Sequence, residues 1–254
     1  MADVRVPQLV AHRGYMTQFP ENTWPALEAA LQAGAHWLEC DIQMCRDGEF
    51  VLLHDDNFVR TAGVELSVFE VDGRDIAVSV HEPQRFGDRY APTPVARLAD
   101  VLRQIAAWPE ARIMVEIKQE SIDRRGLDPV MEKLLPQLTA CKQCVLISYN
   151  RAALEWARRR SAIPVGWVLH EYDATYRHQA LSLAPDYLIC NERKIDATDT
   201  PWPGPWRWML YDIVDPQRAL SWAARGVELI ETCDIGALLQ DPRLKPAGAC
   251  NGTL

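Results

Sequence analysis

Short runs of apolar residues alternate with amphipathic stretches along most of this 254-residue chain. In the amphipathic stretches, such as Trp24–Ala33 and Ala152–Arg160, apolar residues recur at the spacing of a helix. The short apolar runs have the length and composition of buried strands. We predict eight strands: Pro7–His12, His36–Ile42, Arg112–Ile117, Gln143–Ser148, Pro164–Leu169, Asp186–Cys190, Arg207–Tyr211 and Glu228–Thr232.

This alternation predicts an α/β fold with a parallel sheet, because a helix between two strands returns the chain to the same end of the sheet. Eight strands with intervening helices in a chain of this length fit a TIM (β/α)8 barrel. A chain of this length can bury one large core, so we expect residues 1–254 to form a single barrel domain.

The alternation breaks in two places. After the second strand, a turn at Asp47-Gly48 and a returning apolar run predict a β-hairpin. Residues 55–94 then form a small insertion at the exit end of strand two, where barrels place substrate-shaping loops. Residues 196–207 are rich in Pro and Trp where a sixth helix is expected. We interpret this second break as a short packed loop rather than a lid.

The charge of the chain indicates which classes of binding partner to expect. The formal net charge is −8, and no cluster of Lys and Arg offers a surface for nucleic-acid phosphates, so we expect no nucleic-acid partner. The run Arg158–Arg160 lies on a helical pattern and is typical of a solvated edge. An anionic substrate must therefore be attracted by a local site.

Neither a membrane segment nor a targeting segment is visible in the sequence. No apolar run approaches the ~18 residues that a membrane span needs, so we expect no stable membrane anchoring. No positive region followed by an apolar stretch occurs at the N-terminus, which makes the cytoplasm the expected compartment. Among seven cysteines only Cys141 and Cys144 have CxxC spacing. One such pair is a weak zinc signal, and we expect free, reduced thiols.

Carboxylates occur near the ends of two predicted strands. Glu39 and Asp41 are two residues apart on one strand, so their side chains point to the same face. Glu116 and Lys118 repeat this spacing on the third strand. Neighbouring carboxylates repel each other unless a cation compensates, and oxygen ligands favour Mg²⁺ or Ca²⁺. Glu116 would complete a three-carboxylate site for one divalent cation, although either pair alone also fits a solvated strand end.

Two histidines are predicted beside these carboxylates. His12 ends the first strand, which neighbours the second in a barrel of sequential order. If the hairpin turns around Asp47-Gly48, cross-strand pairing places His54 nearly opposite Asp41. A single histidine is usually structural, but two beside three carboxylates indicate catalysis. Such a set suits metal-assisted cleavage of a phosphodiester, in which one histidine takes a proton and the other protonates the leaving oxygen.

Several short motifs follow one another in the order of a known family. They are HRG and PENT, then ECD, HDDNFVRT, PTPVARLADVL and EIK. In this order they resemble the glycerophosphodiester phosphodiesterases, relatives of the barrel-shaped phospholipases C, from Gln8 to about Lys118 and more loosely to Leu239. The resemblance implies a TIM-type barrel with a small inserted subdomain. It also implies hydrolysis of small glycerophosphodiesters, such as glycerophosphocholine or glycerophosphoethanolamine, to sn-glycerol 3-phosphate and an alcohol.

The resemblance also implies a role for each candidate residue. These roles are general acid and base for His12 and His54; ligands of one Mg²⁺ or Ca²⁺ for Glu39, Asp41 and Glu116; and substrate binding for Arg13, Lys118, Glu21 and Asn22, the last two as support from the first loop. Two positions depart from the family pattern. Tyr211 stands where an asparagine is usual, and Cys233 stands where an aspartate is common. Together with the missing sixth helix, these departures affect which alcohol group the substrate carries, and they leave the predicted catalytic residues unchanged.

Two alternatives to this function differ in substrate or in turnover. A lysophospholipid cleaved on the headgroup side would require exposed aromatics at the site mouth, where Trp202 and Trp206 are candidates. A barrel that binds phosphodiesters without turnover would have no use for two acid–base histidines. The sequence does not separate attack by the glycerol 2-hydroxyl, through a cyclic phosphate, from direct attack by water. It carries no signal for an oligomeric state.

Overall fold

The computed structural model of the chain describes residues 6–196 and 198–245. Eight parallel strands form a closed ring, in which β1 pairs with both β2 and β9. The strands are β1 (Gln8–Ala11), β2 (Trp37–Met44), β4 (Arg112–Ile117), β5 (Cys144–Ser148), β6 (Val165–Val168), β7 (Tyr187–Asn191), β8 (Arg207–Tyr211) and β9 (Leu229–Thr232). The predicted TIM barrel is confirmed, and each predicted strand exists with bounds within two residues. That residues 1–254 form one domain stays a prediction.

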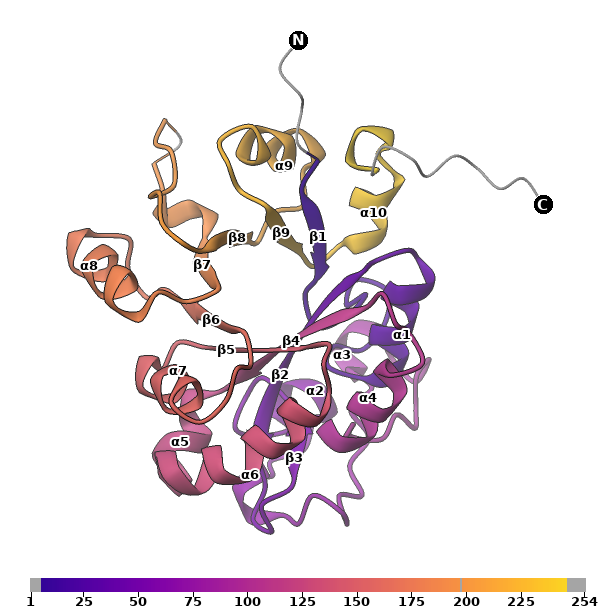
Figure 1. Cartoon of the computed structure of the whole chain (residues 1–254). Helices are drawn as coiled ribbons and strands as arrows, with labels where there is room; N and C mark the ends of the chain where they lie inside the picture. The colour runs from indigo at the N-terminus through magenta and orange to yellow at the C-terminus, as the bar shows by residue number, and fades with distance from the viewer. Residues whose placement is uncertain (1–5, 197, 246–254) are drawn as a thin grey trace.

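Helices follow the barrel strands and lie outside the ring (Figure 1). They are α1 (Trp24–Gln32), α4 (Leu98–Ile105), α5 (Gln119–Arg125), α6 (Leu127–Ala140), α7 (Arg151–Arg158), α8 (Ala174–Leu183), α9 (Pro216–Ala223) and α10 (Ile235–Gln240). Local signals set their starts. Thr23 caps α1 by accepting a hydrogen bond from the backbone N–H of Ala26, and Asn150 caps α7 by accepting one from Ala153.

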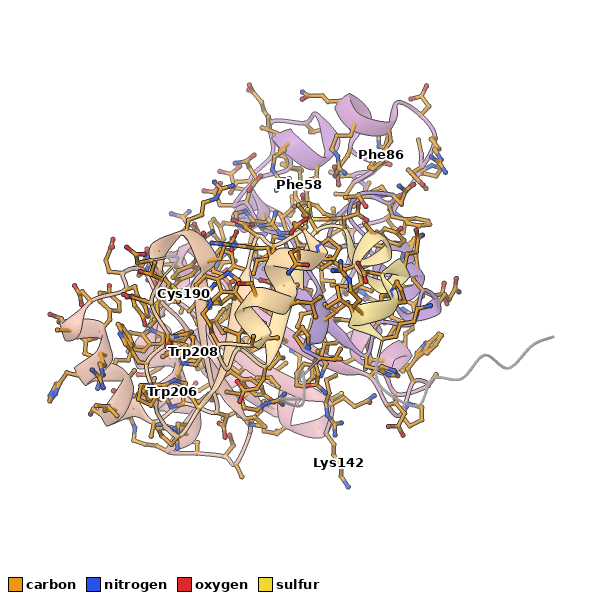
Figure 2. The ribbon with its side chains drawn as sticks, turned by 90° about the horizontal axis from the view of Figure 1, so that it is seen from above. Phe58, Phe86, Lys142, Cys190, Trp206 and Trp208 are labelled. Atoms are coloured by element: carbon orange, nitrogen blue, oxygen red, sulfur yellow. The ribbon has the colours of Figure 1, made fainter. Side chains whose placement is uncertain are left out.

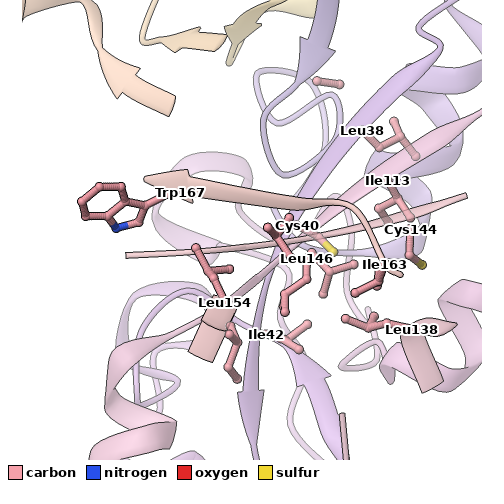
Figure 3. Packing of buried hydrophobic residues seen from close by; sticks show 14 of the residues in the cluster. Leu38, Cys40, Ile42, Ile113, Leu138, Cys144, Leu146, Leu154, Ile163 and Trp167 are labelled. Carbon is pink, nitrogen blue, oxygen red and sulfur yellow. The ribbon is translucent and has the colours of Figure 1, made fainter. Parts of the chain in front are cut away.

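Two hydrophobic layers hold the barrel together, because alternate side chains of each strand point to opposite faces. Outward side chains such as Leu38, Ile113 and Leu146 belong to the same hydrophobic cluster as Leu138 of α6 and Leu154 of α7 (Figure 3). Inward side chains, among them Val10, Met114 and Met209, fill the barrel centre. The inner layer fills the barrel towards the amino ends of the strands, and a cavity lies towards their carboxyl ends.

The predicted hairpin and insertion follow β2. Strand β3 (Phe50–Leu52) runs antiparallel to the end of β2, and the insertion contains α2 (Val59–Ala62), η1 (Val68–Glu70) and α3 (Pro83–Phe86). Phe58, Val68 and Val80 are buried in a hydrophobic cluster separate from the barrel core. In Figure 2, Phe58 and Phe86 lie at the opposite end of the molecule from Lys142, which precedes β5. The insertion therefore stands at the carboxyl ends of the strands.

The hairpin register agrees with the prediction that His54 lies nearly opposite Asp41. The ladder pairs Ile42 with Leu52, and the next residue, Leu53, donates its N–H to the carbonyl of Asp41. Leu53 is therefore directly opposite Asp41, and His54 is the next residue along the chain. His54 lies beyond the end of β3, because the strand stops at Leu52, and its side chain reaches the cavity from the following loop.

The loop that replaces the sixth helix is packed, as predicted. Trp206 is buried, and Trp202 stacks on Tyr172 with the ring centroids 3.9 Å apart. Both tryptophans also contact Trp208 of β8, edge to face. These rings occupy the space beside β7 and β8 where a helix would otherwise cover the barrel.

The cysteines within residues 6–196 and 198–245 are free, as predicted; Cys250 lies outside the described residues. In the same part of the chain, each helix is too short or too polar to cross a membrane.

Candidate active site

A cavity of about 230 Å³ opens at the carboxyl ends of the barrel strands. Its lining contains His12, Arg13, Glu39, Asp41, His54, Glu116 and Lys118, all of them candidates from the sequence. It also contains Ile147, Tyr149, Val168, Ile189, Met209, Tyr211, Asp212 and Glu231, which were not assigned to a site. Glu21 and Asn22 are buried but do not line the cavity. The barrel thus gathers side chains from strands that are far apart in the sequence.

Strand register explains why three carboxylates meet. Asp41 of β2 pairs with Glu116 of β4, and Glu39 pairs with Met114, so all three acids point into the barrel. Ligand oxygens of Glu39, Asp41 and Glu116 lie within 4.8 Å of one another, and the side chains are almost fully buried. The predicted three-carboxylate cluster is therefore present as a geometric arrangement.

Two basic side chains compensate part of this charge. Lys118 Nζ lies 2.8 Å from Glu116 and 3.3 Å from Asp41, and Arg13 Nε lies 2.9 Å from Asp41. Burial alone would raise the pKa of Asp41, but Arg13 and Lys118 outweigh burial and hold that pKa well below its usual range. Glu116 receives less compensation, so burial raises its pKa to about 7 despite Lys118.

Of the three clustered acids, Glu39 has the fewest partners. Its Oε2 accepts a hydrogen bond from the backbone N–H of Arg13 at 3.1 Å, whereas its Oε1 is buried without any partner. Burial and the neighbouring charge of Asp41 raise the pKa of Glu39 well above its usual value. An orphaned buried oxygen beside two further carboxylates fits a divalent cation, and the all-oxygen donor set favours Mg²⁺ or Ca²⁺.

The two candidate histidines reach the cavity from different sides. His12 directly follows β1, and its Nε2 lies 4.0 Å from Glu39 Oε2. Burial and the charge of Arg13 lower the pKa of His12 to about 4, so its imidazole is neutral at neutral pH and can accept a proton. Nδ1 of His54 contacts a carboxylate oxygen of Asp55 at 2.7 Å, which orients the ring and leaves its other nitrogen for the cavity.

The β1–α1 loop holds Arg13 and Asp41 in place. Arg13 and Asn22 both have positive φ, at 53° and 54°, and Asn22 donates its backbone N–H to the Arg13 carbonyl. The Asn22 amide donates to Asp41 Oδ2 at 3.0 Å and accepts the Asp41 backbone N–H at 3.1 Å. Glu21 accepts hydrogen bonds from Arg13 and from Arg60 of α2. Glu21 and Asn22 thus contact Arg13 and Asp41 on the side away from the cavity.

The other half of the cavity is apolar and aromatic. Ile147, Val168, Ile189 and Met209 of β5–β8 form its wall. Tyr149 and Tyr211 also line the cavity, and their hydroxyls form a hydrogen bond of 2.9 Å. The sequence singled out Tyr211 as a departure from the family pattern. A signal for Tyr149 was also available, because it is a polar-tipped residue just after the end of a barrel strand.

Glu231 is the main site residue that the sequence interpretation missed. It lies on β9, is 5% exposed and lines the cavity. Burial and the charges of Glu116 and Asp41 raise its pKa to about 8. The available signal was an acid inside the predicted strand Glu228–Thr232, two positions after Leu229 and therefore on the same inward face.

The fold is a closed (β/α)8 barrel, and its cavity at the carboxyl ends of the strands holds acidic, basic and imidazole groups. These features define a TIM-barrel protein with a hydrolase-type site. A family model described as the glycerophosphoryl diester phosphodiesterase family matches residues 12–202. The chain belongs to this family. The matched range contains every predicted site residue, although Glu231 lies outside it.

Individual relatives agree with this assignment. The chain is 25% identical over 186 residues to a glycerophosphodiester phosphodiesterase of Caldanaerobacter subterraneus subsp. tengcongensis, covering 71% of this chain and 76% of that protein. It is 29% identical over 168 residues to a probable glycerophosphodiester phosphodiesterase 1 of Mycobacterium tuberculosis, covering 61% of each chain. The chain spans about three fifths of the length of the Mycobacterium tuberculosis relative and of two further curated relatives that it matches.

A solved structure shares the fold. It is an Oleispira antarctica phosphodiesterase in complex with the product sn-glycerol-3-phosphate, with a TM-score of 0.81 and 21% sequence identity. The similarity covers 92% of this chain and 95% of that one. At this level of identity the likeness supports the barrel fold.

Proposed function

We propose that this protein hydrolyses small glycerophosphodiesters to sn-glycerol 3-phosphate and an alcohol, with one divalent cation as cofactor. The observation that carries the proposal is that His12 and His54 line one cavity together with the Glu39, Asp41 and Glu116 cluster. A barrel that only bound phosphodiesters would gain nothing from two imidazoles at a carboxylate cluster. Family membership supports the same reaction class.

The cation would be held by Glu39, Asp41 and Glu116, where it would neutralise phosphate charge and acidify the attacking hydroxyl. The protein's own groups do the rest. Arg13 and Lys118 bind and orient the anionic phosphate, with the forked guanidinium of Arg13 fixed by Asp41 and Glu21. Glu21 and Asn22 act on the substrate indirectly, by positioning Arg13 and Asp41.

Proton transfer is assigned to the two histidines. His12 is neutral at physiological pH, since burial and Arg13 lower its pKa, and it takes the proton of the attacking hydroxyl, which belongs either to water or to the glycerol 2-position. In the second case the product is a cyclic phosphate, which water then opens to sn-glycerol 3-phosphate. His54 delivers a proton to the leaving oxygen, with its ring oriented by Asp55. After the reaction, His12 releases its extra proton to solvent and His54 takes one up, so both imidazoles return to their starting states.

The two halves of the cavity set the orientation of the substrate. The phosphate lies towards β1, β2 and β4, where the charged groups are, and one alcohol portion lies against the apolar wall of β5–β8. Trp202 and Trp206 pack into the loop and do not line the cavity, so they provide no apolar surface there for an acyl chain. This favours a soluble diester over a lysophospholipid.

The substrate assignment is tested by incubating the protein with glycerophosphocholine, glycerophosphoethanolamine or long-chain lysophosphatidylcholine. Mg²⁺, Ca²⁺ or excess chelator is added to each. We expect sn-glycerol 3-phosphate from the first two substrates, dependent on the cation. If none of the diesters is hydrolysed with any cation, the proposed function is wrong. Turnover of the lysophospholipid alone would replace it with the lysophospholipase D-like alternative.

The roles of the histidines are tested by substitution. His12→Ala and His54→Ala should each lower kcat by about 10²–10⁴-fold, because each removes a proton-transfer group. His170→Ala is a matched control, since His170 stacks on Tyr149 at the rim but does not line the cavity. Its kcat should stay within a few-fold of the wild type. Wild-type rates in either of the first two variants would contradict the assignment.

A further inference from the structure

Strand β1 lies between β2 and β9, and this order brings a second group of metal-ligating side chains together. His12 follows β1, while Glu39 belongs to β2 and Glu231 to β9. One ligand atom from each of these three residues lies within 4.8 Å of the others. The group shares Glu39 with the three-carboxylate cluster but extends to the opposite side of it, towards β9.

The basic side chains of the cavity form their ion pairs within the first cluster, and the charge of Arg13 offsets that of Glu39 and Glu231 only in part. Arg13 and Lys118 form ion pairs with Asp41 and Glu116. Among the described residues, Glu231 has no hydrogen-bond or ion-pair partner for its carboxylate, although it is only 5% exposed and lines the cavity. A buried carboxylate without a partner is costly unless a cation binds it. The missing partner is independent of the acid cluster itself and points to a positive ligand.

We propose that His12, Glu39 and Glu231 form a second cation site, suited to a transition-type divalent cation such as Zn²⁺. One imidazole nitrogen with two carboxylates is a donor set that zinc accepts, with a fourth position left for water or substrate. The all-oxygen site of Glu39, Asp41 and Glu116 instead suits Mg²⁺ or Ca²⁺. Glu39 has two oxygens and would bridge the two cations.

Occupation of the second site has a consequence that rests on the proposed function. A cation on His12 uses the imidazole lone pair that accepts the proton of the attacking hydroxyl, so Zn²⁺ inhibits the hydrolysis. Glu231 forms no ion pair with Arg13 or Lys118, the two residues proposed to bind the phosphate. Its contribution to the second site can therefore be removed while the first cluster keeps its ligands.

The site itself is tested by crystallography. Crystals of the full chain grown with Mg²⁺ are soaked in Zn²⁺, and anomalous diffraction is recorded on both sides of the zinc edge. We expect an anomalous peak at about 2.0–2.2 Å from ligand atoms of His12, Glu39 and Glu231. Glu231→Gln should lose this peak. A wild-type peak only among Glu39, Asp41 and Glu116, or no peak in the cavity, would overturn the proposal.

Inhibition is tested separately at saturating Mg²⁺. The Zn²⁺ concentration for half inhibition should rise roughly 10-fold or more in Glu231→Gln, because one of three protein ligands is lost. Asp212→Asn is the matched control, since Asp212 lines the same cavity but does not belong to the group. It should be inhibited like the wild type. Equal inhibition of all three proteins would overturn the inhibitory role. If the protein hydrolyses no diester, the proposed function fails, and the diffraction experiment still decides the cation site.

Discussion

At the scale of single residues, the side chains that sequence reasoning found are those whose chemistry and position coincide. His12, Glu39 and Asp41 are polar residues at the exit ends of predicted strands, and alternation along a strand fixes which way they point. Glu231 was missed although it obeys the same rule. It is one acid in a short apolar strand, and its significance comes from Glu39 and His12, which only the closure of the barrel brings near it.

Asn22 provides a test of positioning at this scale. Its amide makes two hydrogen bonds to buried Asp41, and its φ of 54° is one that glycine adopts without strain. Asn22→Gly should therefore remove the hydrogen bonds while leaving the backbone path available. We expect a loss of about 1–3 kcal/mol in the free energy of unfolding, measured by urea denaturation. Cation affinity, measured by titration calorimetry, should fall as well.

A merely structural Asn22 would give a different result. Stability would then fall while the affinity for Mg²⁺ or Ca²⁺ stayed at the wild-type value. That outcome would contradict the proposal that Asn22 acts by positioning Asp41.

At the scale of elements, the β1–α1 loop is held by one contact within its own segment and by another with a residue far away in the sequence. Gly14 has φ of +83°, and a Cβ there would lie 2.5 Å from the backbone carbon of Ala26 in α1. The glycine lets the loop fold back against the helix and so carries Arg13 to the site. Glu82 of the insertion holds the same loop from the other side, by accepting the backbone N–H of Glu21 at 2.5 Å. The second contact joins residues 61 positions apart, so no local pattern could reveal it.

Gly14→Ala should be markedly more destabilising than Gly34→Ala. Gly34 also has positive φ, at +102°, but a Cβ added there would meet no atom within 4 Å. Both variants carry the backbone penalty of about 1–2 kcal/mol for a left-handed alanine. Gly14→Ala adds a clash with backbone, worth about 1–3 kcal/mol more. Thermal or urea unfolding of both variants measures the difference, and equal losses would show that the close packing of the loop on α1 is not needed.

The hairpin shows where element-scale prediction ends. The turn at Asp47-Gly48 and the antiparallel pairing of β3 follow from sequence pattern. The end of β3 does not, because Leu52 and Leu53 are equally apolar and Leu53 still donates its N–H to Asp41 although the strand ends at Leu52. The position of this strand end decides whether His54 belongs to the ladder or to the loop beside the cavity.

At the scale of the whole molecule, the barrel was predictable because each strand–helix unit is encoded locally and parallel strands with crossover helices close in few ways. The uneven charge of the cavity was not predictable in the same way. It results from eight strands meeting, with the acids of β2, β4 and β9 on one side and the apolar residues of β5–β8 on the other. This division has a thermodynamic consequence for the protein without its cation.

The stability of the cation-free protein should fall as pH rises from about 6.5 to about 8. Burial raises the pKa of Glu116 to about 7 and that of Glu231 to about 8, from an ordinary value of 4.5. Over this range the unfolded chain has already released both protons, whereas the folded chain must either keep them or bury new charge. A raised folded-state pKa gives stability below the unfolded pKa that is lost as pH rises through the folded one, here on the order of a few kcal/mol. His12 is neutral in the folded state throughout this range and adds only a small opposing effect below about pH 7.

Saturating Mg²⁺ or Ca²⁺ should reverse this loss, since the cation binds the deprotonated carboxylates of the folded state and not those of the unfolded chain. The rise in thermal midpoint on adding the cation should therefore be larger at about pH 8 than at about pH 6.5. Scanning calorimetry with chelator and with each cation measures it, with NaCl at the same ionic strength as the control. Glu231→Gln should weaken the pH dependence in chelator, because it removes one of the two titrating groups. A cation-free midpoint that stays constant or rises over this pH range would show that these buried carboxylates do not determine the stability of the barrel there.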